Sequence, residues 1–544
     1  MSQRDVRLAG SRSVLVELPD LDSVLGLSAL LRTSPLPGQL DVLAAASTVF
    51  IKADCAANAQ AIAKTVRTLE LGSSAAATGS LITVPVHYDG EDLAEVARLT
   101  SLSPEAVINA HSQQIWRAAF GGFAPGFAYL RGENQLLNVP RRAIPRKAVP
   151  AGAVALAGEY SAVYPRQSPG GWQLIGHTDA VLWDLERENP ALIRPQDRVQ
   201  FIPSRAALTV ADAPAAEPAP DTERPASSAA QLEILDPGLQ SLIQDAGRPG
   251  LGDLGVSTAG WADAISAAQA NRLVGNQPGA AVIENLLGTL TLRARGDAVL
   301  AVSGACATVN ITPVDGDDFH EFRQIPMDTP FALLDGELLA LTPNGAGLRS
   351  YLGVRGGFDV PQVLGSRSSD SMSGIGPAPL RAGQLLPVGE VSGLQVVGNP
   401  EPSPLPVPAE HGVFTLRITP GPREDWFGAP GLARLTGQLW KASADSNRVG
   451  VRLELGQDDA RPLERVRAGE LASEGVALGS LQVPPSGLPV LFLADHPVTG
   501  GYPVIAAVVD EDLPAAAQLP PGSLIRFELT SHPGTRTPVK ESRA

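Results

Sequence analysis

The strongest candidate for a ligand-binding segment in the first half of the chain is GGFAPGFAYL, residues 121–130. Its glycines and proline favour an exposed loop, and its aromatic rings crowd around that loop. Such a segment can wall an apolar pocket for a substrate, or it can be a rigid corner whose rings only cover backbone. The substrate-binding candidates here are Phe123, Gly126, Phe127 and Tyr129.

Two more groups of candidates follow in the same half. The basic stretch RRAIPRKAVPAG (141–152) stands out in an acidic protein and suits a phosphate or carboxylate ligand, with a solvated basic face as the alternative. The corner SPGGW (168–172) brings two glycines beside a tryptophan, which is typical of barrel packing and also lets a ligand approach the backbone. The phosphate-binding candidates are Arg141, Arg146 and Lys147, and the corner adds Gly170 and Gly171 as substrate-binding candidates.

Several standard catalytic motifs are missing from the sequence. No lysine follows a glycine, which excludes the phosphate-binding P-loop, and neither HExxH nor GxSxG occurs. HYDGED (87–92) has metal-binding residue types, but Asp-Gly after a strand first of all predicts a turn, so we expect no metal site. Cys55 and Cys306 form no CxxC pair and predict no disulfide framework.

Length and composition limit the architecture and the partners. A chain of 544 residues exceeds one ordinary core, and roughly one domain per 150 residues predicts three to four domains. The counts Gly 55 and Pro 48 predict many turns and favour β-structure. The net charge of −15 disfavours nucleic acids and anionic membranes as partners. Without a long apolar run or a disulfide framework, the chain is expected to be cytoplasmic.

The first elements predict an α+β domain with ferredoxin-like order. Two helices are expected, one over Asp22–Leu31 and one N-capped by Asp54. The strands that flank them are SVLVEL (13–18), DVLAAASTVFIKA (41–53) and LITVPVHY (81–88). A further helix, N-capped by Ser103, is expected to end near His111, after which the pattern becomes β.

A weak internal repeat links the two halves of the chain. Each copy has a VP-Gly turn into an apolar strand, a Gly-Gly-aromatic bend and a closing strand that ends in Phe. In order, VPAGAVALAG (149–158), SPGGWQLIG (168–176) and RPQDRVQF (194–201) match VPPSGLPVLFLAD (483–495), VTGGYPVIA (498–506) and LPPGSLIRF (519–527). Paired glycines beside an aromatic suit a barrel corner, so we expect related β barrels in both halves.

These patterns divide the chain into four domains, a linker and a tail. The linker is rich in Ala and Pro and lacks aromatics, so it cannot bury enough apolar surface to fold. The predicted segments are 1–95 (α+β), 96–203 (first barrel), 204–231 (linker), 232–400 (first β domain of the second half), 401–530 (second barrel) and 531–544 (disordered tail).

The first half, from about Ser13 to Pro203, closely resembles the B subunit of the ATP-dependent bacterial 5-oxoprolinase. This family is also known as allophanate hydrolase subunit 1 and as the sporulation kinase inhibitor. The stretches that carry the resemblance are GFAPGFAYL, VPAGAVALAGEYSAVYP and SPGGWQLIGHT. The second half, residues 232–530, resembles the C subunit of the same enzyme in GLQSLIQDAGRPGLGDLGV (238–256), ADAISAAQANRLVGN (262–276), SADSNRVGVRL (443–453) and LASEGVALGSLQVPPSGLPVLFLAD (471–495).

The resemblance implies a fused B–C unit, mainly β with α+β, with a ferredoxin-like N-terminal domain and cyclophilin-like barrels in both halves. It further implies that the chain works with ATP, Mg²⁺ and a separate A subunit to open 5-oxo-L-proline to L-glutamate. The chain departs from the family pattern at His177, at Ser486-Gly487 and at Ala262, where the family usually has Arg, Asp-Gly and Met.

Opening a lactam needs an activated carbonyl, a base for the attacking water and donors for the substrate's carboxylate. In QDAGR, Asp245 is a candidate base or metal anchor and Arg248 a candidate anion clamp, with a buried pair that closes a turn as the alternative. His111 at the end of a helix is a candidate base or a structural residue.

The second half offers two more candidates with structural alternatives. Asp263, in the first turn of an amphipathic helix, is a catalytic candidate or a helix cap. Ser446, Asn447 and Arg448 suit anion recognition at the substrate, or they form an Asx-type turn before a strand.

Two other functions stay open. One is the carboxyltransferase part of a urea carboxylase, whose biotin would be carried by another chain because no lysine here follows a methionine. The other is a regulatory protein that binds and inhibits a sensor kinase. The sequence locates no ATP site, because it has no nucleotide motif, and it leaves homo-oligomer formation open.

Overall fold

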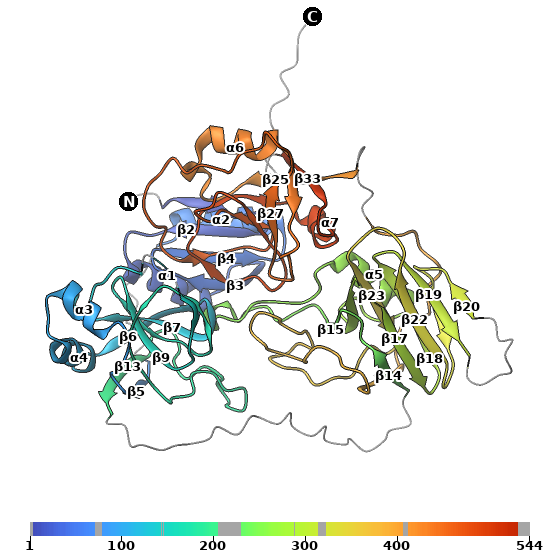
Figure 1. Ribbon diagram of the computed structural model, residues 1–544, viewed down its shortest axis with the longest axis horizontal. Helices are drawn as coiled ribbons and strands as arrows, with labels where there is room; N and C mark the ends of the chain where they lie inside the picture. Colours follow the sequence, from blue (N-terminus) through green and yellow to red (C-terminus); the bar gives the residue numbers. More distant parts are fainter. Residues whose placement is uncertain are drawn as a thin grey trace, which may run out of the picture.

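The computed structural model describes residues 4–70, 79–142, 144, 146–204, 230–287, 289–313, 322–405 and 412–530. Figure 1 shows an α+β unit and a barrel in the first half, and a two-sheet unit and a second barrel in the second half. This confirms the predicted fold class, mainly β with α+β and a barrel in each half. Residues 205–229 of the predicted linker and the whole predicted tail lie outside the described residues.

The α+β unit is a four-stranded sheet in the order β1-β2-β4-β3, packed against two helices. The alternation of side chains in β2 explains its position, because Val14 and Val16 enter the helix-side core while Leu15 faces the opposite way. Helix α1 begins after Asp20, whose carboxylate accepts the N–H of Ser23 at 2.8 Å. The elements are β1 (Val6–Leu8), β2 (Ser13–Glu17), α1 (Leu21–Thr33), β3 (Gln39–Ala44), β4 (Thr48–Ala53) and α2 (Ala56–Thr68).

Three local predictions for this unit differ from the structure. DVLAAASTVFIKA is a hairpin, not one strand, because the chain turns after Ala44 and returns as β4. The N-cap of α2 is Cys55, not Asp54, whose carboxylate instead accepts a hydrogen bond from Asn58 at 2.7 Å. LITVPVHY is a strand, as predicted, but it joins the next sheet, and β1 takes the edge beside β2.

The first barrel is a seven-stranded sheet in the order β12-β9-β10-β7-β6-β13-β5. Its two edges meet where His87 and His177 exchange two backbone hydrogen bonds of 2.8 Å. Because β5 pairs in parallel with β13, this sheet begins before residue 95. The elements are β5 (Leu81–Val86), α3 (Leu93–Thr100), α4 (Pro104–Ser112), β6 (Trp116–Gly122), β7 (Ala124–Gly132), β8 (Arg146–Val149), β9 (Ala153–Ala157), β10 (Tyr160–Val163), β11 (Ser168–Gly170), β12 (Gln173–His177) and β13 (Arg198–Pro203).

The two-sheet unit begins the second half. A six-stranded sheet, β20-β19-β22-β17-β14-β24, and a five-stranded sheet, β15-β16-β23-β18-β21, contribute to one apolar core, and α5 packs on β18 and β23. The elements are β14 (Gln231–Asp236), β15 (Gln240–Gln244), η1 (Gly252–Leu254), α5 (Ala264–Leu273), β16 (Val282–Leu286), β17 (Leu290–Arg295), β18 (Ala298–Gly304), β19 (Ala307–Thr312), β20 (Arg323–Ile325), β21 (Phe331–Leu333), β22 (Leu338–Pro343), β23 (Arg349–Val354) and β24 (Leu385–Pro387).

The second barrel is closed, in the order β25-β32-β29-β30-β27-β26-β33. A two-stranded sheet, β28 and β31, accompanies it. The elements are β25 (Val413–Pro420), η3 (Glu424–Trp426), α6 (Gly428–Gly437), β26 (Trp440–Ala442), β27 (Gly450–Leu455), β28 (Glu474–Gly475), β29 (Ser480–Gln482), β30 (Val490–Phe492), β31 (Thr499–Gly500), β32 (Val504–Val508), η4 (Asp510–Asp512), α7 (Leu513–Ala517) and β33 (Leu524–Leu529).

The two barrels share one strand order, which supports the predicted repeat. In the first barrel, β5 pairs in parallel with the last strand, as β25 does in the second. Both barrels also bury a tryptophan, Trp116 or Trp440, whose indole N–H binds the carbonyl five residues earlier. The strand order corrects one match of the repeat, because β9 corresponds to β29 and not to the strand at 490–492.

The second barrel packs on the four-stranded sheet of the first half (Figure 1). Gly475 of β28 lies so close to β4 that a Cβ there would be 2.3 Å from the Cβ of Phe50. The Arg423 guanidinium joins Glu474 of its own barrel at 2.6 Å to Glu17 of the first half. The first and last thirds of the chain therefore share one interface. No helix in the described ranges is long and apolar enough to cross a membrane.

Candidate functional site

The segment of residues 244–263, which we call the junction segment, contacts all three other bodies. The Ser257 hydroxyl donates to the carbonyl of Ala494 in the second barrel at 3.2 Å. Lys52 Nζ of the α+β unit lies 3.3 Å from Thr258 Oγ1. Gly255, at φ +76°, passes so close to the first barrel that a Cβ would lie 2.2 Å from the carbonyl of Ala124. Residues from both halves of the chain therefore meet at this segment.

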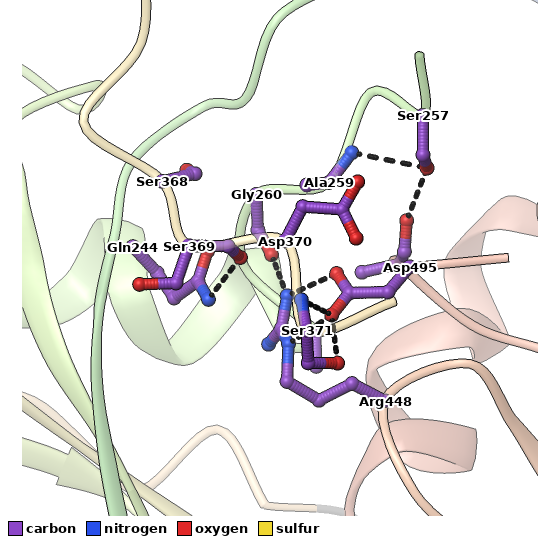
Figure 2. A network of polar contacts seen from close by, with 12 residues as sticks. Gln244, Ser257, Ala259, Gly260, Ser368, Ser369, Asp370, Ser371, Arg448 and Asp495 are labelled. Atoms are coloured by element: carbon purple, nitrogen blue, oxygen red, sulfur yellow. Dashed lines mark hydrogen bonds and ion pairs between the residues drawn. The ribbon is translucent and has the colours of Figure 1, made fainter. Parts of the chain in front are cut away.

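Arg448 of the second barrel is the centre of a buried polar network at this junction (Figure 2). Its guanidinium binds Asp495 through two hydrogen bonds of 2.9 and 3.0 Å, and it donates to the carbonyl of Gly260 at 2.5 Å. It also pairs with Glu284, which comes from β16 of the two-sheet unit. The guanidinium thus links the second barrel to the two-sheet unit, and its donors are largely used by the protein itself.

The pKa of the Glu284 carboxyl reflects the charges of this network. Burial alone would raise its pKa, but Arg448 and Arg349 outweigh burial and hold the pKa below its ordinary value of 4.5. The hydroxyl of Tyr351 and the N–H of Ala262 add hydrogen bonds of 2.9 and 3.0 Å. Burial likewise opposes the charge of Arg448, yet Asp495 and Glu284 raise the pKa of that group.

Asp245 closes a turn by accepting four hydrogen bonds. Its Oδ1 accepts the hydroxyls of Ser366 and Ser368 at 2.5 and 2.6 Å and the N–H of Gly247 at 2.8 Å. Its Oδ2 accepts the N–H of Arg367 at 2.6 Å. Because three of these four hydrogen bonds come from residues 366–368, this carboxylate holds that stretch in place.

Arg248 lies next to that turn but forms no ion pair within 4 Å in the described part of the chain. It donates to two carbonyls, Val363 at 3.4 Å and Ser368, while its Nη1 is buried without a partner. The side chain is only 2% exposed. Burial lowers the pKa of this guanidinium, even though Asp370, Asp245 and Asp495 act in the opposite direction.

Asp263 caps helix α5. Its Oδ1 accepts the N–H groups of Ile265 and Ser266, both at 3.0 Å, and its Oδ2 accepts Gln518 Nε2 at 2.8 Å. Burial raises the pKa of this carboxyl. Since Gln518 follows α7 of the second barrel, the cap also ties that barrel to the two-sheet unit.

Ser446 and Asn447 lie in the turn before β27. Ser446 Oγ accepts the N–H of Arg452 at 3.1 Å, and Asn447 Oδ1 accepts the N–H of Val449 at 2.8 Å. This is the Asx-type turn that the sequence left open. Of the three neighbouring candidates, only Arg448 reaches the buried network.

The aromatic segment, residues 121–130, supplies the first half's side of the contact with the second barrel. Phe127 and Tyr129 are buried in the core of the first half, and Phe123 packs at its edge. Phe123 has a left-handed backbone, φ 64°, and its N–H donates to Thr499 Oγ1 of the second barrel at 2.9 Å. A Cβ on Gly126 would lie 3.0 Å from the carbonyl of Leu182. The segment therefore meets β31 directly, while its rings fill the core.

The glycine corner packs against the same aromatic core. A Cβ on Gly170 would lie 2.2 Å from the hydroxyl of Tyr164, and the carbonyl of Gly171 accepts the N–H of Arg142 at 2.7 Å. Trp172 is buried against Phe127. The predicted barrel corner is present, and protein atoms occupy the space beside Gly170.

The basic stretch is split between paired and exposed cations. Arg146 Nη2 pairs with Asp92 and Glu91, at 2.9 and 3.0 Å, and Arg142 also pairs with Asp92. Burial by itself would raise the pKa of Asp92. The hydrogen bond from Arg146 and the charges of Arg146 and Arg142 outweigh burial, so the pKa is lowered. Arg141 and Lys147 are exposed. Arg146 therefore holds the HYDGED stretch, and within the described residues no group of three His, Cys, Asp or Glu could hold a metal ion.

His111 is fully buried, away from the junction. Its Nδ1 lies 2.8 Å from the Tyr88 hydroxyl and its Nε2 lies 2.8 Å from the Ser161 hydroxyl. Burial lowers its pKa to about 3. A neutral imidazole enclosed by Tyr88, Ser161 and the Phe201 ring has the surroundings of a core residue.

The sequence analysis missed several residues of the junction. Glu284 was detectable, because a lone carboxylate in the apolar strand VIENL predicts a buried, paired charge. The hydroxyl-rich stretch SRSSDSMS (366–373) holds Asp370 and also supplies Ser371, whose N–H and hydroxyl donate to Asp495 at 2.9 and 2.5 Å. Asp495 gave no local signal.

The class of protein is shown by two family models that together cover both barrels and the junction. The model for "carboxyltransferase domain, subdomain A and B" matches residues 254–529, and the model for subdomains C and D matches residues 4–193. The chain belongs to this carboxyltransferase-domain family.

Within the family, the second half is similar to the 5-oxoprolinase C subunit of Escherichia coli. The two are 33% identical over 308 residues, which are 54% of this chain and 90% of that protein. The first half is similar to the 5-oxoprolinase B subunit of Haemophilus influenzae, with 45% identity over 127 residues, 23% of this chain and 60% of that protein. The crystal structure of a protein named TTHA0988 is 34% identical, covers 95% of this chain and 99% of its own, and has a TM-score of 0.79.

Proposed function

We propose that this chain is the joined B and C component of an ATP-dependent 5-oxoprolinase. With a separate A subunit, it opens the lactam of 5-oxo-L-proline to give L-glutamate. The substrate is a small polar molecule with one carboxylate and one ring amide, and the chain binds and orients it at the junction segment.

One observation carries the proposal. Two stretches of a single chain are similar to two differently named subunits of one enzyme, and they supply opposite sides of one junction. The contact of Phe123 with Thr499 and the contact of Lys52 with Thr258 both cross from one half to the other. A joined chain keeps the two components at a fixed ratio and a high effective concentration.

The proposed reaction consumes ATP, and the described residues contain no group of three metal-ligating side chains that could hold a metal ion by themselves. Arg146, a predicted phosphate ligand, is taken up by Asp92 and Glu91. We therefore propose that nucleotide activation takes place on the A subunit. In this proposal, the chain contributes the binding and orientation of the substrate.

The carboxyltransferase part of a urea carboxylase is the second candidate. The family description favours it, because both matched models are named for a carboxyltransferase domain. Such a protein would take a carboxyl group from a biotin carried on another chain. The two candidates differ in the ligand, since urea carries no charge.

The deciding experiment mixes the purified chain with a candidate A subunit, ATP, Mg²⁺ and 5-oxo-L-proline, and follows glutamate and phosphate. We expect both products only when the chain and the A subunit are present together. Controls omit each protein in turn. Release of neither product, together with urea-dependent consumption of carboxybiotin, would replace the proposal by the second candidate.

A further inference from the structure

We propose that a cavity on the outer face of the first barrel is a binding site for an amino dicarboxylate, held by Arg117, Arg131 and Arg198. The residues that line the cavity select this chemical class. Only the choice of L-glutamate as the member that binds rests on the proposed function, because L-glutamate is the product of that reaction.

The cavity lies where the first barrel faces the beginning of helix α1. It has a volume of about 550 Å³, and its lining includes Leu21 of α1 and Ile115, which comes just before β6. Pockets that hold small molecules commonly measure roughly 300–1,000 Å³. The cavity is therefore large enough for a ligand of the size of an amino acid.

The same cavity adjoins the junction segment. A second cavity, of about 380 Å³, shares Ala119 and Gln196 with the first, and its lining includes Gly250 and Leu254 of the junction segment. The proposed amino-dicarboxylate site and the proposed place of substrate binding are therefore neighbours.

The three arginines stand side by side on neighbouring strands. Arg117 of β6 is the register partner of Arg198 in β13 and of Arg131 in β7. Because Trp116 and Val199 enter the barrel core, the arginines next to them in the chain face outwards. Strands in a sheet lie about 5 Å apart, so the row places three positive charges within roughly 10 Å along the sheet.

This row of like charges is not explained by its ion pairs. Like charges directly opposite each other on neighbouring strands are destabilising. Arg198 has no ion pair among the described residues, while Arg117 lies 3.6 Å from Asp22 and Arg131 lies 3.2 Å from Glu159. The Asp22 side chain is 82% exposed, and pairs exposed to solvent contribute little stability. An anion bound between the arginines would relieve their repulsion.

The donors of the row are accessible from the cavity. All three arginines line it, and none of their guanidiniums forms a hydrogen bond with the described residues. The side chains of Arg117 and Arg131 are 41% and 37% exposed, and Arg198 is exposed too. A carboxylate can accept two parallel hydrogen bonds from one guanidinium. The row can therefore hold two carboxylates, about one strand spacing apart.

The acidic residues in the same lining select the charge of the ligand. Asp22, Glu133 and Glu159 offset the charge of the three arginines. A compact dianion such as inorganic phosphate would bring its whole charge to one place among these carboxylates, whereas two carboxylates divide the charge along the row. Glu133 has no partner among the described residues and can accept an ammonium group. An amino dicarboxylate, with a single net negative charge, uses both sets of residues.

The test measures binding of L-glutamate, glutarate, 5-oxo-L-proline and inorganic phosphate to the full chain by calorimetry. Glutarate lacks the ammonium group and 5-oxo-L-proline lacks the second carboxylate, so we expect L-glutamate to bind most tightly. Losing one charge-assisted contact predicts a roughly 10-fold weaker Kd for L-glutamate in Arg117→Gln. Arg198→Gln, which removes no ion pair within the described ranges, is expected to weaken binding without affecting the fold. Glu133→Gln should weaken the binding of L-glutamate and not that of glutarate.

The matched control is Arg452→Gln, an exposed arginine of β27 whose side chain forms no hydrogen bond or ion pair with the described residues. It is expected to bind L-glutamate as the wild type does.

The outcomes separate this site from the proposed function. If Arg117→Gln and Arg198→Gln both bind L-glutamate as tightly as wild type, the site is wrong, even where the chain and the A subunit together form glutamate. If L-glutamate binds through these arginines but no glutamate is formed from 5-oxo-L-proline, the site stands and the 5-oxoprolinase function falls. No binding of L-glutamate to the wild-type chain, or tighter binding of phosphate than of L-glutamate, overturns the site.

Discussion

Replacing Arg448 by methionine tests whether the Arg448 network holds the second barrel to the two-sheet unit. Methionine keeps much of the volume of arginine and removes its charge. The substitution leaves Asp495, which is 0% exposed, and Glu284, which is 3% exposed, without their shared cation. Removing one partner from a buried ion pair costs about 3–5 kcal/mol.

Part of that cost is offset by the partners that remain. Glu284 keeps Arg349 at 3.4 Å and the Tyr351 hydroxyl at 2.9 Å, and Asp495 keeps two hydrogen bonds from Ser371. We therefore expect the lower end of the range, about 3 kcal/mol. At about 1.4 kcal/mol per factor of ten, local opening of the joint should become roughly 100-fold more frequent.

Hydrogen exchange resolves that local opening, which a single unfolding curve of a multidomain chain does not. Peptides that cover residues 257–263 and 490–496 should exchange faster in Arg448→Met, and peptides in β17 and β22 should not change. Arg452→Met, four residues away and exposed, is the control. An increase below about fivefold, close to 1 kcal/mol, would refute the reasoning.

The destabilisation caused by Arg448→Met should also depend on pH. The folded-state pKa of Glu284 is held below 4.5, so the stabilisation it brings is complete above that pH and is lost as the pH falls through the folded-state value. The difference between wild type and Arg448→Met should therefore narrow below pH 4.5. A difference that widened on acidification would contradict this sign.

Three further predictions concern stability. Gly475→Ala should destabilise the chain by about 1–3 kcal/mol, because the new methyl meets Phe50 in a packed interface. Thermal unfolding measures this loss, and an unchanged midpoint would show that the interface accommodates the methyl group. Gly26→Ala, in helix α1 with nothing within 4 Å of the new methyl, should stabilise by about 0.5–1 kcal/mol in the same assay, and a loss would mean that the helix surface is not open there. His111 stays neutral in the fold down to a pKa of about 3, whereas the unfolded chain takes up a proton below about 6.5, so acidification favours unfolding. The free energy of unfolding, measured with urea, should fall by about 1.4 kcal/mol per pH unit below 6.5 through this residue. His111→Gln should be less sensitive to acid than wild type, and equal sensitivity would contradict a neutral, buried His111.

The local part of the fold was predictable because it depends on neighbours along the chain. The alternation in β2 and the cap of α4 by Ser103, whose hydroxyl accepts the N–H of Ala106 at 3.2 Å, follow from periodicity and capping chemistry. The hairpin between β3 and β4 was missed because Ala45–Ser47 carries no Gly, Pro or Asn. The sheet that β5 joins was missed because pairing with β13 is set more than 110 residues away, from Leu81 to Arg198.

The sequence by itself predicted the fold class, from strand and helix periodicity together with a weak repeat, and the family, from its resemblance to known subunits. It left open whether Asp263 and Asn447 cap a helix and a turn or bind a ligand. Only the tertiary structure decided which charges meet. Arg448 is paired with carboxylates 47 and 164 residues away along the chain. Electrostatic pairing depends on distance in space and on burial, and neither can be read from the order of residues until the chain has packed.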